Sequence, residues 1–325
     1  MGEMETLSVD IVVPLYNDEE VVELLCETVL NTIGDKFRSV RLILVDDGSK
    51  DGTNHVARKI SQEKEEVEYI RLAGNFGQHR AISAGLKFTT SSLVAVMDSD
   101  LQDRPEDIIR LVQKMHDDDN PMAIARRKKR SASVFKRFSS RAFALTSNLL
   151  VPFKVDPNLG AFRVMDQSIV SELNQVNETT GTPFSLLYSM GVPFSTVDLE
   201  RSPRVAGSTG YNLRKSFRLA SDRIMTYSIK PIRLAIMLGI ISGLFSLGVA
   251  AYTIINFGIQ DRVAPGWTSI AFLTSFFGGM NLLFMGILGE YIGRIYDEVK
   301  QRPTFIIDEK RVILPQPDQY VIERN

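Results

Sequence analysis

Cysteine and tryptophan each occur only once in this chain of 325 residues, as Cys26 and Trp267. A single cysteine excludes an internal disulfide and suits a reducing compartment. Because Cys26 lies in a segment with helical spacing, we expect it to be a small core residue. Histidine is also scarce, with three in all. Neither His79 nor His116 has a second His or Cys at metal-ligand spacing, so we expect both to be structural or solvated.

Several familiar motifs are missing as well. The first ten residues have neither a basic region nor an apolar core, and we expect no secretory signal peptide. The first expected strand, at 9–14, is followed by neither G-x-G-x-x-G nor G-x-x-x-x-G-K-[ST]. Dinucleotide and ATP chemistry therefore have no support.

Net charge is small, at −1, but this balance conceals an uneven distribution. Residues 126–141 hold eight Lys and Arg and no acid, and residues 201–233 hold eight with a single acid, Asp222. Clustered bases attract anionic partners such as nucleic acid or lipid. The apolar segments that follow them favour lipid, and we expect no nucleic-acid partner.

Two long runs contain no charged residue, at 234–260 and 264–289. Each exceeds the ~20 residues that cross ~30 Å of hydrocarbon. Because the link between them is short, we expect a transmembrane hairpin with helices near 234–256 and 267–289. Basic residues flank both of its ends and place them in the cytoplasm by the positive-inside rule: Lys230, Arg233, Arg294, Lys300 and Arg302. The alternative is a pair of buried core helices.

Apolar runs typical of buried strands alternate with stretches of helical spacing. The strands are expected at 9–14, 40–45, 67–72 and 93–97. This alternation predicts an α/β fold with right-handed βαβ units and a mainly parallel sheet. Ligands bind beyond the carboxyl ends of such strands. Polar residues follow each of these ends, so we expect one site there: Pro14, Tyr16, Asn17, Asp46, Asp47, Gly77, Gln78, Asp98 and Asp100.

The tripeptide Asp98-Ser99-Asp100 directly follows the last of these apolar runs and is trailed by Gln102. Two carboxylates one residue apart at the end of a buried strand are typical of a divalent-cation site. Mg²⁺ and Mn²⁺ prefer oxygen ligands and share them with the phosphates of a substrate. The alternative is that these residues only cap a helix.

Two segments with helical spacing, 131–151 and 211–227, mix apolar and basic residues. Basic amphipathic helices beside membrane spans are typical of interfacial elements. We therefore expect Lys136, Arg137 and Arg141 to offer a cationic landing site for a lipid phosphate. The alternative is solvated helices packed on the sheet.

Six strings carry a resemblance to a known family: VPLYN at 13–17, VDDGS at 45–49, NFGQH at 75–79, DSDLQ at 98–102, GAFR at 160–163 and LGEYIGRIY at 288–296. With them the chain resembles the bacterial polyprenyl-phosphate glycosyltransferases, which have the inverting GT-A fold and load undecaprenyl phosphate with glucose or 4-amino-arabinose-type sugars. Dolichyl-phosphate mannose synthases are more distant relatives. The resemblance covers nearly the whole chain.

The resemblance implies a set of site residues. The nucleotide-sugar would be held by Pro14, Tyr16, Asn17, Glu19, Asp46, Asp47, Gln78, Asp98, Ser99, Asp100 and Arg204. Asp98, Asp100 and Gln102 would hold Mg²⁺ or Mn²⁺. The acceptor phosphate would meet Arg127, Arg130, Lys136, Arg137, Arg141 and Arg201. Asp98, Asp100, Arg127 and Asp156 would serve catalysis.

Two positions depart from the family's pattern. Many relatives have Lys six residues after Arg204, where this chain has Gly210. Arg204 and Arg201 would then have to supply the neutralising positive charge on the loop that closes over the donor. Relatives also place an acid shortly before the Phe-Arg pair, and Asp156 lies one residue further upstream than expected.

The implied reaction is inverting, metal-dependent transfer of a sugar from a nucleotide-sugar, with UDP favoured, to a polyprenyl phosphate for cell-envelope glycan or lipid modification. The implied domains are a cytoplasmic GT-A domain at 1–205, a basic amphipathic segment at 206–231, a hairpin at 232–289 and a cytoplasmic tail at 290–325. The location would be the inner membrane. The spacings Gly239/Gly243 and Gly289/Gly293, with a tail strand at 304–307, favour a homo-oligomer, with a tetramer as one form.

Two other functions stay open. A processive polysaccharide synthase of the same fold would carry Q-x-x-R-W and more membrane spans, but Trp267 lies in the hairpin without that context. A catalytically silent membrane scaffold is favoured only by Gly210 and the displaced Asp156.

Overall fold

The structure is a computed structural model that describes residues 4–127, 156, 158–176, 181–200, 225, 228–260 and 266–308. These residues belong to two compact units. The first contains the described residues up to 200 together with 302–308, and the second contains 225 and those from 228 to 301. The domain boundaries expected from the sequence stay predictions.

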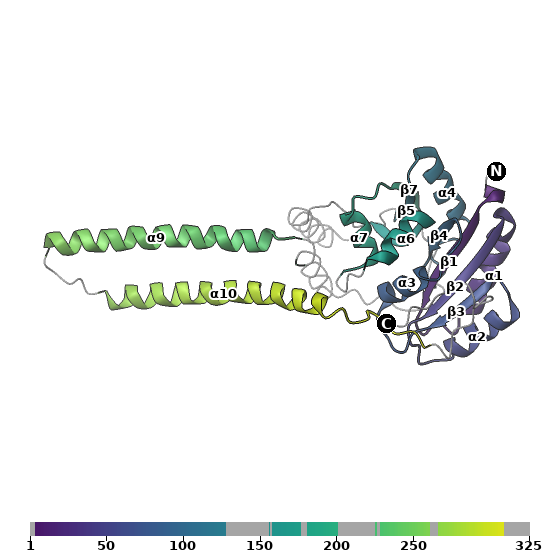
Figure 1. Ribbon diagram of the computed structural model, residues 1–325, viewed down its shortest axis with the longest axis horizontal. Helices are drawn as coiled ribbons and strands as arrows, with labels where there is room; N and C mark the ends of the chain where they lie inside the picture. Colours follow the sequence, from purple (N-terminus) through teal and green to yellow (C-terminus); the bar gives the residue numbers. More distant parts are fainter. Residues whose placement is uncertain are drawn as a thin grey trace. The chain divides into compact units, whose positions relative to one another are not determined.

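The described part of the first unit is organised around a seven-stranded sheet (Figure 1). Its strands are β1 (Ser8–Leu15), β2 (Ser39–Asp46), β3 (Val67–Arg71), β4 (Leu93–Val96), β5 (Met122–Arg127), β6 (Leu159–Asp166) and β7 (Ser195–Leu199). They lie in the order β3-β2-β1-β4-β6-β5-β7. Only β6 runs antiparallel to its neighbours, β4 and β5. The mainly parallel α/β sheet expected from the sequence is therefore confirmed.

Helices connect these strands: α1 (Val22–Ile33), α2 (Thr53–Glu63), α3 (Gln78–Leu86), α4 (Asp107–Asp118), α6 (Gln167–Gln175) and α7 (Pro183–Ser189), with short 3-10 turns η1 (Met4–Thr6) and η2 (Gly34–Lys36). Helical spacing of apolar residues in the sequence runs from Asp18 to Ile33, whereas α1 begins only at Val22. Before it, the Asp18 carbonyl accepts the backbone N–H groups of Val21 and Val22 in a turn.

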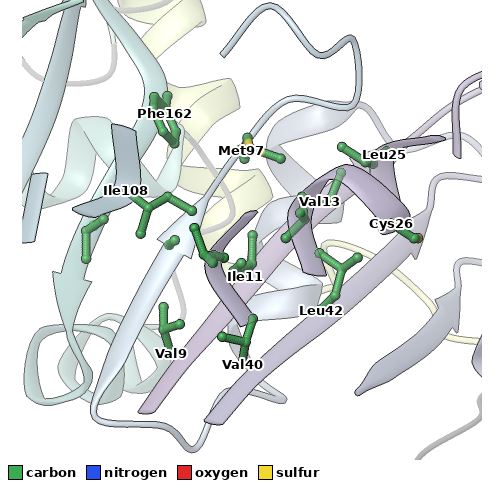
Figure 2. Close-up of a cluster of buried hydrophobic side chains, with 14 of the residues drawn as sticks. Val9, Ile11, Val13, Leu25, Cys26, Val40, Leu42, Met97, Ile108 and Phe162 are labelled. Atoms are coloured by element: carbon green, nitrogen blue, oxygen red, sulfur yellow. The ribbon is translucent and has the colours of Figure 1, made fainter. Parts of the chain in front are cut away.

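Side chains alternate across the sheet because successive residues of a strand point to opposite faces. Val9, Ile11 and Val13 of β1 join one buried cluster with residues of α1, α2 and α4 (Figure 2). Val12 joins a second cluster with residues of α3, α6 and α7. Helices thus cover both faces, as a parallel sheet requires.

Cys26 lies within the first cluster and is 1% exposed (Figure 2). Burial raises the pKa of its thiol to about 12. A thiol of this kind is inert because the thiolate is the reactive form. The expectation that Cys26 is a core residue is confirmed.

A buried ionic cluster ties the amino-terminal part of the sheet together. Arg41 of β2 donates from Nε and Nη2 to the two oxygens of Asp10 on β1, at 2.9 and 2.6 Å. Its Nη1 donates to Oε1 of Glu68 on β3 at 2.6 Å. Asp10 also accepts the backbone N–H groups of Thr90 and Ser91, just before β4. One guanidinium and one carboxylate therefore link four parts of the fold.

The second unit contains two long helices, α9 (Lys230–Gln260) and α10 (Trp267–Val299), which run side by side in Figure 1. Stretches of 20 and 24 residues, Lys230–Val249 and Phe276–Val299, have mean hydropathies of 2.0 and 1.2. By length and composition each could cross a membrane. Arg294 and Glu290 pair at 2.8 Å, as i,i+4 spacing predicts.

The GxxxG glycines do not form the contact between α9 and α10. A Cβ added at Gly239, Gly243, Gly289 or Gly293 would meet nothing within 4 Å. Ser242 of α9 instead reaches the Met280 sulfur of α10 at 3.2 Å. Among the described residues, these four glycines therefore face open space rather than close packing.

Candidate active site at the carboxyl edge of the sheet

The carboxyl ends of β1, β2 and β4 lie side by side, which brings the loops after them to one edge. Leu15 at the end of β1 pairs with Asp46 at the end of β2. Val12 pairs with Val96 at the end of β4. Because the strands are parallel, the predicted clusters at 14–17, 46–47 and 98–100 share this edge. Tyr16 is 42% exposed there and offers an aromatic face.

The loops after β1 and β2 interlock through reciprocal hydrogen bonds. Asn17, in the left-handed region at φ 56°, accepts Lys50 N–H on Oδ1 at 2.9 Å. Its own N–H donates to Ser49 Oγ at 3.0 Å. Glu19 accepts Gly52 N–H at 2.9 Å. Asn17 and Glu19, both predicted to bind the nucleotide-sugar, thus fix the loop geometry.

Asp46 is fully buried at the end of β2. Its carboxylate accepts Ser49 N–H at 2.7 Å and the Tyr69 hydroxyl at 2.8 Å, and it pairs with Arg71 at 3.0 Å. Burial, followed by the negative charge of Asp46, raises the pKa of Tyr69, which stays protonated as a donor. These contacts of the Asp46 carboxylate therefore stabilise the end of β2.

Asp47, the next residue, is 2% exposed and points to a different partner. Its two oxygens accept the backbone N–H groups of Phe76 and Gly77, at 2.7 and 2.8 Å. Burial raises the pKa of this carboxyl group, and the two backbone donors oppose the rise. Asp47 therefore anchors the loop after β3, which runs on to Gln78.

The Asp98-Ser99-Asp100 turn follows β4 and is held from two sides. Gln78 Nε2 donates to Asp98 Oδ1 at 2.6 Å. Ser99 Oγ donates to Asp18 Oδ2 at 2.8 Å. Asp100 Oδ1 accepts Gln102 N–H at 3.1 Å within the turn. The structure thus brings together the predicted residues Gln78, Asp98, Ser99, Asp100 and Gln102.

Asp18 was missed by the sequence analysis, which assigned its neighbour Glu19 to this edge instead. Its Oδ2 accepts both the Tyr16 N–H, at 2.9 Å, and the Ser99 hydroxyl. Burial raises the pKa of Asp18, and the negative charges of Asp51 and Asp100 raise it further. A weaker signal was present, since Asp18 follows the first expected strand, although what singled out Asp98 was its pairing with Asp100 one residue apart.

The residues of this turn fit a hard divalent cation. Asp98 and Asp100 supply carboxylate oxygens, the ligands that Mg²⁺ and Mn²⁺ prefer. Among the described residues no group of three or more His, Cys, Asp and Glu side chains is placed to hold a metal ion. The chain therefore provides part of a coordination sphere, and phosphate oxygens or water would have to complete it.

Arg127 and Asp156 lie where β5 ends and β6 begins. The Arg127 guanidinium lies against Gly160, since a Cβ there would come within 3.5 Å of Nε. Arg127 N–H donates to the Asn158 carbonyl at 3.0 Å. Asp156 Oδ1 accepts Asn158 N–H at 2.9 Å. The structure therefore places Arg127 and Asp156, two of the four residues predicted to serve catalysis, near the same end of the β5–β6 pair.

Arg163, in the GAFR string, is only 1% exposed. It donates to the carbonyls of Ala161 and Gly160, at 3.1 and 2.8 Å, and stacks over the Phe184 ring at 3.5 Å. His79 lies edge-on to the same ring at 5.9 Å. Arg163 therefore stabilises the start of β6, and His79, which was expected to be structural or solvated, packs against the same ring.

The remaining predicted residues lie outside the described part of the chain. They are Arg130, Lys136, Arg137, Arg141, Arg201 and Arg204, together with Gly210. The basic helices expected at 131–151 and 211–227 lie there too, apart from the single described residue 225. These assignments stay predictions.

Residues 10–173 match the family described as Glycosyl transferase family 2. Over 304 residues the chain is 32% identical to an uncharacterised glycosyltransferase of Synechocystis sp., covering 94% of this chain and 96% of that protein. It is 31% identical to a bactoprenol glucosyl transferase of Shigella phage SfX, covering 94% of this chain and 100% of the relative.

Among solved structures, a mannosyltransferase of Pyrobaculum calidifontis in complex with GDP-Man and Mn²⁺ is similar at a TM-score of 0.49 and 14% identity, over 92% of this chain and 88% of that chain. The family match includes β1 to β6 and the Asp98-Ser99-Asp100 turn. The GT-A type of α/β fold expected from the sequence is confirmed, and the chain belongs to glycosyl transferase family 2.

Proposed function

We propose that this glycosyltransferase transfers a sugar from a nucleotide-sugar, with UDP as the favoured nucleotide, to a polyprenyl phosphate at the cytoplasmic face of the inner membrane. The observation that carries the proposal is the Asp98-Ser99-Asp100 turn, braced by Gln78 and Asp18 at the carboxyl edge of a family 2 sheet. Phosphoryl oxygens and carboxylates of this kind share one divalent cation.

Support for the acceptor comes from the relatives and from α9 and α10. The phage relative, which the chain matches over its whole length, is named for bactoprenol glucosyl transfer. The two helices have the length and composition to cross a membrane. A lipid phosphate is reached most directly by an enzyme anchored in the same membrane. Glucose is therefore the first donor sugar to test.

The donor site would use the exposed Tyr16 and the loops that Asp47 and Asn17 hold in place. A bound Mg²⁺ or Mn²⁺ would act as a Lewis acid that offsets charge on the departing nucleoside diphosphate. Asp98 and Asp100 would hold it, with Gln102 beside them. Because Gln78 and Asp18 fix this turn before substrate binds, little reorganisation is needed during the reaction.

The acceptor phosphate is already anionic at neutral pH and needs no strong general base. One of its oxygens would attack the anomeric carbon while the bond to the nucleoside diphosphate breaks, which inverts the configuration. Arg127 would orient the acceptor phosphate by charge-assisted hydrogen bonds. Asp156 would position Asn158, whose carbonyl accepts the Arg127 N–H. Positioning and electrostatics then supply most of the rate.

The membrane arrangement is part of the same proposal. Basic residues next to both helices would keep the ends of the hairpin, and with them the catalytic domain, in the cytoplasm. The open space around the GxxxG glycines leaves room for a second copy, and a homo-oligomer is part of the proposal.

A transfer assay tests the function. Purified protein in detergent would receive undecaprenyl phosphate, Mg²⁺ or Mn²⁺, and labelled UDP-, GDP- or dTDP-sugars. We expect label in the lipid phase with one donor and its loss with EDTA. Transfer that persists in EDTA would contradict the metal role. UDP binding without transfer from any donor would support the silent scaffold.

A further inference from the structure

Residues 305–308 lie against β3, the edge strand of the sheet in the first unit. We propose that this segment, the tail clasp, positions the loop 73–78 and through it the Gln78–Asp98 contact in the donor site. The proposal rests on the proposed function for the meaning of that site, but the position of the loop can be measured without it.

Backbone pairing is the first observation. Leu72 and Ile307 form an antiparallel bridge. Ala73 N–H donates to the Ile306 carbonyl, and Asp308 N–H donates to the Arg71 carbonyl, both at 2.8 Å. The clasp thus adds a short strand to the sheet edge, in the β-augmentation mode by which sheets bind extended peptides.

Side-chain alternation is the second observation. Phe305 and Ile307 pack against the second core cluster, whereas Ile306 between them is 56% exposed. Lys87 of α3 places its Nζ 5.4 Å from the centre of the Phe305 ring. This period of two fixes the register, because a slip by one residue would expose both packed side chains.

The clasp pairs with the residues that lead into the donor site. Arg71, whose carbonyl it binds, pairs with Asp46 and donates to the Ser49 carbonyl at 3.0 Å. Phe76 and Gly77, a few residues on, are the donors to Asp47. Gln78 then reaches Asp98.

On the side away from the clasp, the loop 73–78 comes close to the backbone just after β2. A Cβ at Gly48 would come 2.5 Å from the Gly74 carbonyl carbon, and Gly48 itself has φ 68°. The loop is therefore held between Asp47 and Gly48 on one side and the clasp on the other. Holding a backbone segment in one conformation costs free energy. Loss of the contacts with the clasp should therefore also weaken the contacts of the loop with Asp47 and Gly48.

The test uses the full-length protein and a matched pair of variants. Asp308→Pro removes the N–H that donates to Arg71, whereas Asp308→Ala keeps that N–H and removes only the carboxylate. Phe305→Ala is a second variant that removes packing without touching the backbone bond. The readouts are amide hydrogen exchange at 71–78 and the split between KM for the donor and kcat.

We expect faster exchange at Ala73, Phe76 and Gly77 in Asp308→Pro and in Phe305→Ala. The donor KM should rise about fivefold, the factor that one hydrogen bond of about 1 kcal/mol is worth, with little change in kcat. Both effects should be clearly larger in Asp308→Pro than in Asp308→Ala, because only the proline variant loses the N–H that donates to the Arg71 carbonyl.

Two results would overturn the proposal. Faster exchange at Ala73 with unchanged exchange at Phe76 and Gly77 and unchanged KM would show that the clasp only covers the sheet edge. Unchanged exchange at all these positions would show that the clasp does not hold the loop. If the wild type transfers no sugar, the proposed function fails, whereas the exchange data still decide whether the clasp positions the loop.

Discussion

Asp46 and Asp47 are neighbours in the sequence, yet their carboxylates have different partners. Asp46 binds Arg71, Tyr69 and the following turn, whereas Asp47 binds the loop after β3. Composition and spacing predict that acids gather at this strand end, because strand direction fixes where they fall. Composition and spacing do not predict which of the two acids forms the buried ion pair, since that depends on Tyr69 and Arg71 of β3, more than twenty residues further along the chain.

At the residue scale, Asp100→Ala should reduce transfer at least about 10²-fold, because the cation and the leaving diphosphate lose a ligand. The protein should still fold and insert. Transfer rates with saturating donor, together with a thermal unfolding scan, check this. The matched control is Asp117→Asn, an exposed acid on α4. Normal turnover in Asp100→Ala would remove the metal assignment.

The buried carboxyl group of Asp47 should make the stability of the protein depend on pH. Burial raises its pKa above the ordinary 3.8, so the folded state disfavours the charged form. The stability it contributes is therefore greatest below 3.8 and is lost as pH rises to its folded pKa. The melting temperature of the wild type minus that of Asp47→Asn should fall across this window and then level off. A difference that rises with pH would contradict the argument.

At the scale of elements, the buried ionic cluster around Arg41 makes a strong prediction. Arg41→Met leaves Asp10 and Glu68 buried without their shared cation, which should cost about 3–5 kcal/mol of unfolding free energy. Chemical denaturation of the two proteins measures this. Arg58→Met, on the exposed face of α2, should change stability little. Equal effects of the two substitutions would show that the cluster does not stabilise the sheet.

Four of the seven strand positions in this sheet were predictable because four apolar runs end at polar clusters, whereas β5, β6 and β7 were not predicted. The sequence placed strands at 9–14 and 93–97, and the structure has Ser8–Leu15 and Leu93–Val96. The antiparallel direction of β6 was not predictable, since no local pattern encodes the direction of a strand. Asp18 was missed for a different reason, because its place before a helix resembles an ordinary helix start.

At the scale of the whole molecule, the single buried cysteine allows a clean test of topology. Cys26 should not react with a maleimide, because its thiol is buried and has a pKa of about 12. Gly266→Cys, at the start of α10, should be labelled from outside by a membrane-impermeant maleimide in right-side-out vesicles. Arg302→Cys should be labelled only after permeabilisation. The reverse pattern would contradict a cytoplasmic catalytic domain.

Because β6 runs antiparallel to β5, β5 ends and β6 begins at the same edge of the sheet. Arg127 and Asp156 therefore lie at the two ends of the segment that connects these strands. The entropy of closing such a segment grows slowly with its length. A change in the length of this segment would therefore cost the strands on either side little free energy. If the residues predicted to meet the acceptor lie in that segment, acceptor preference would change with it while the loops after β1, β2 and β4 stay the same.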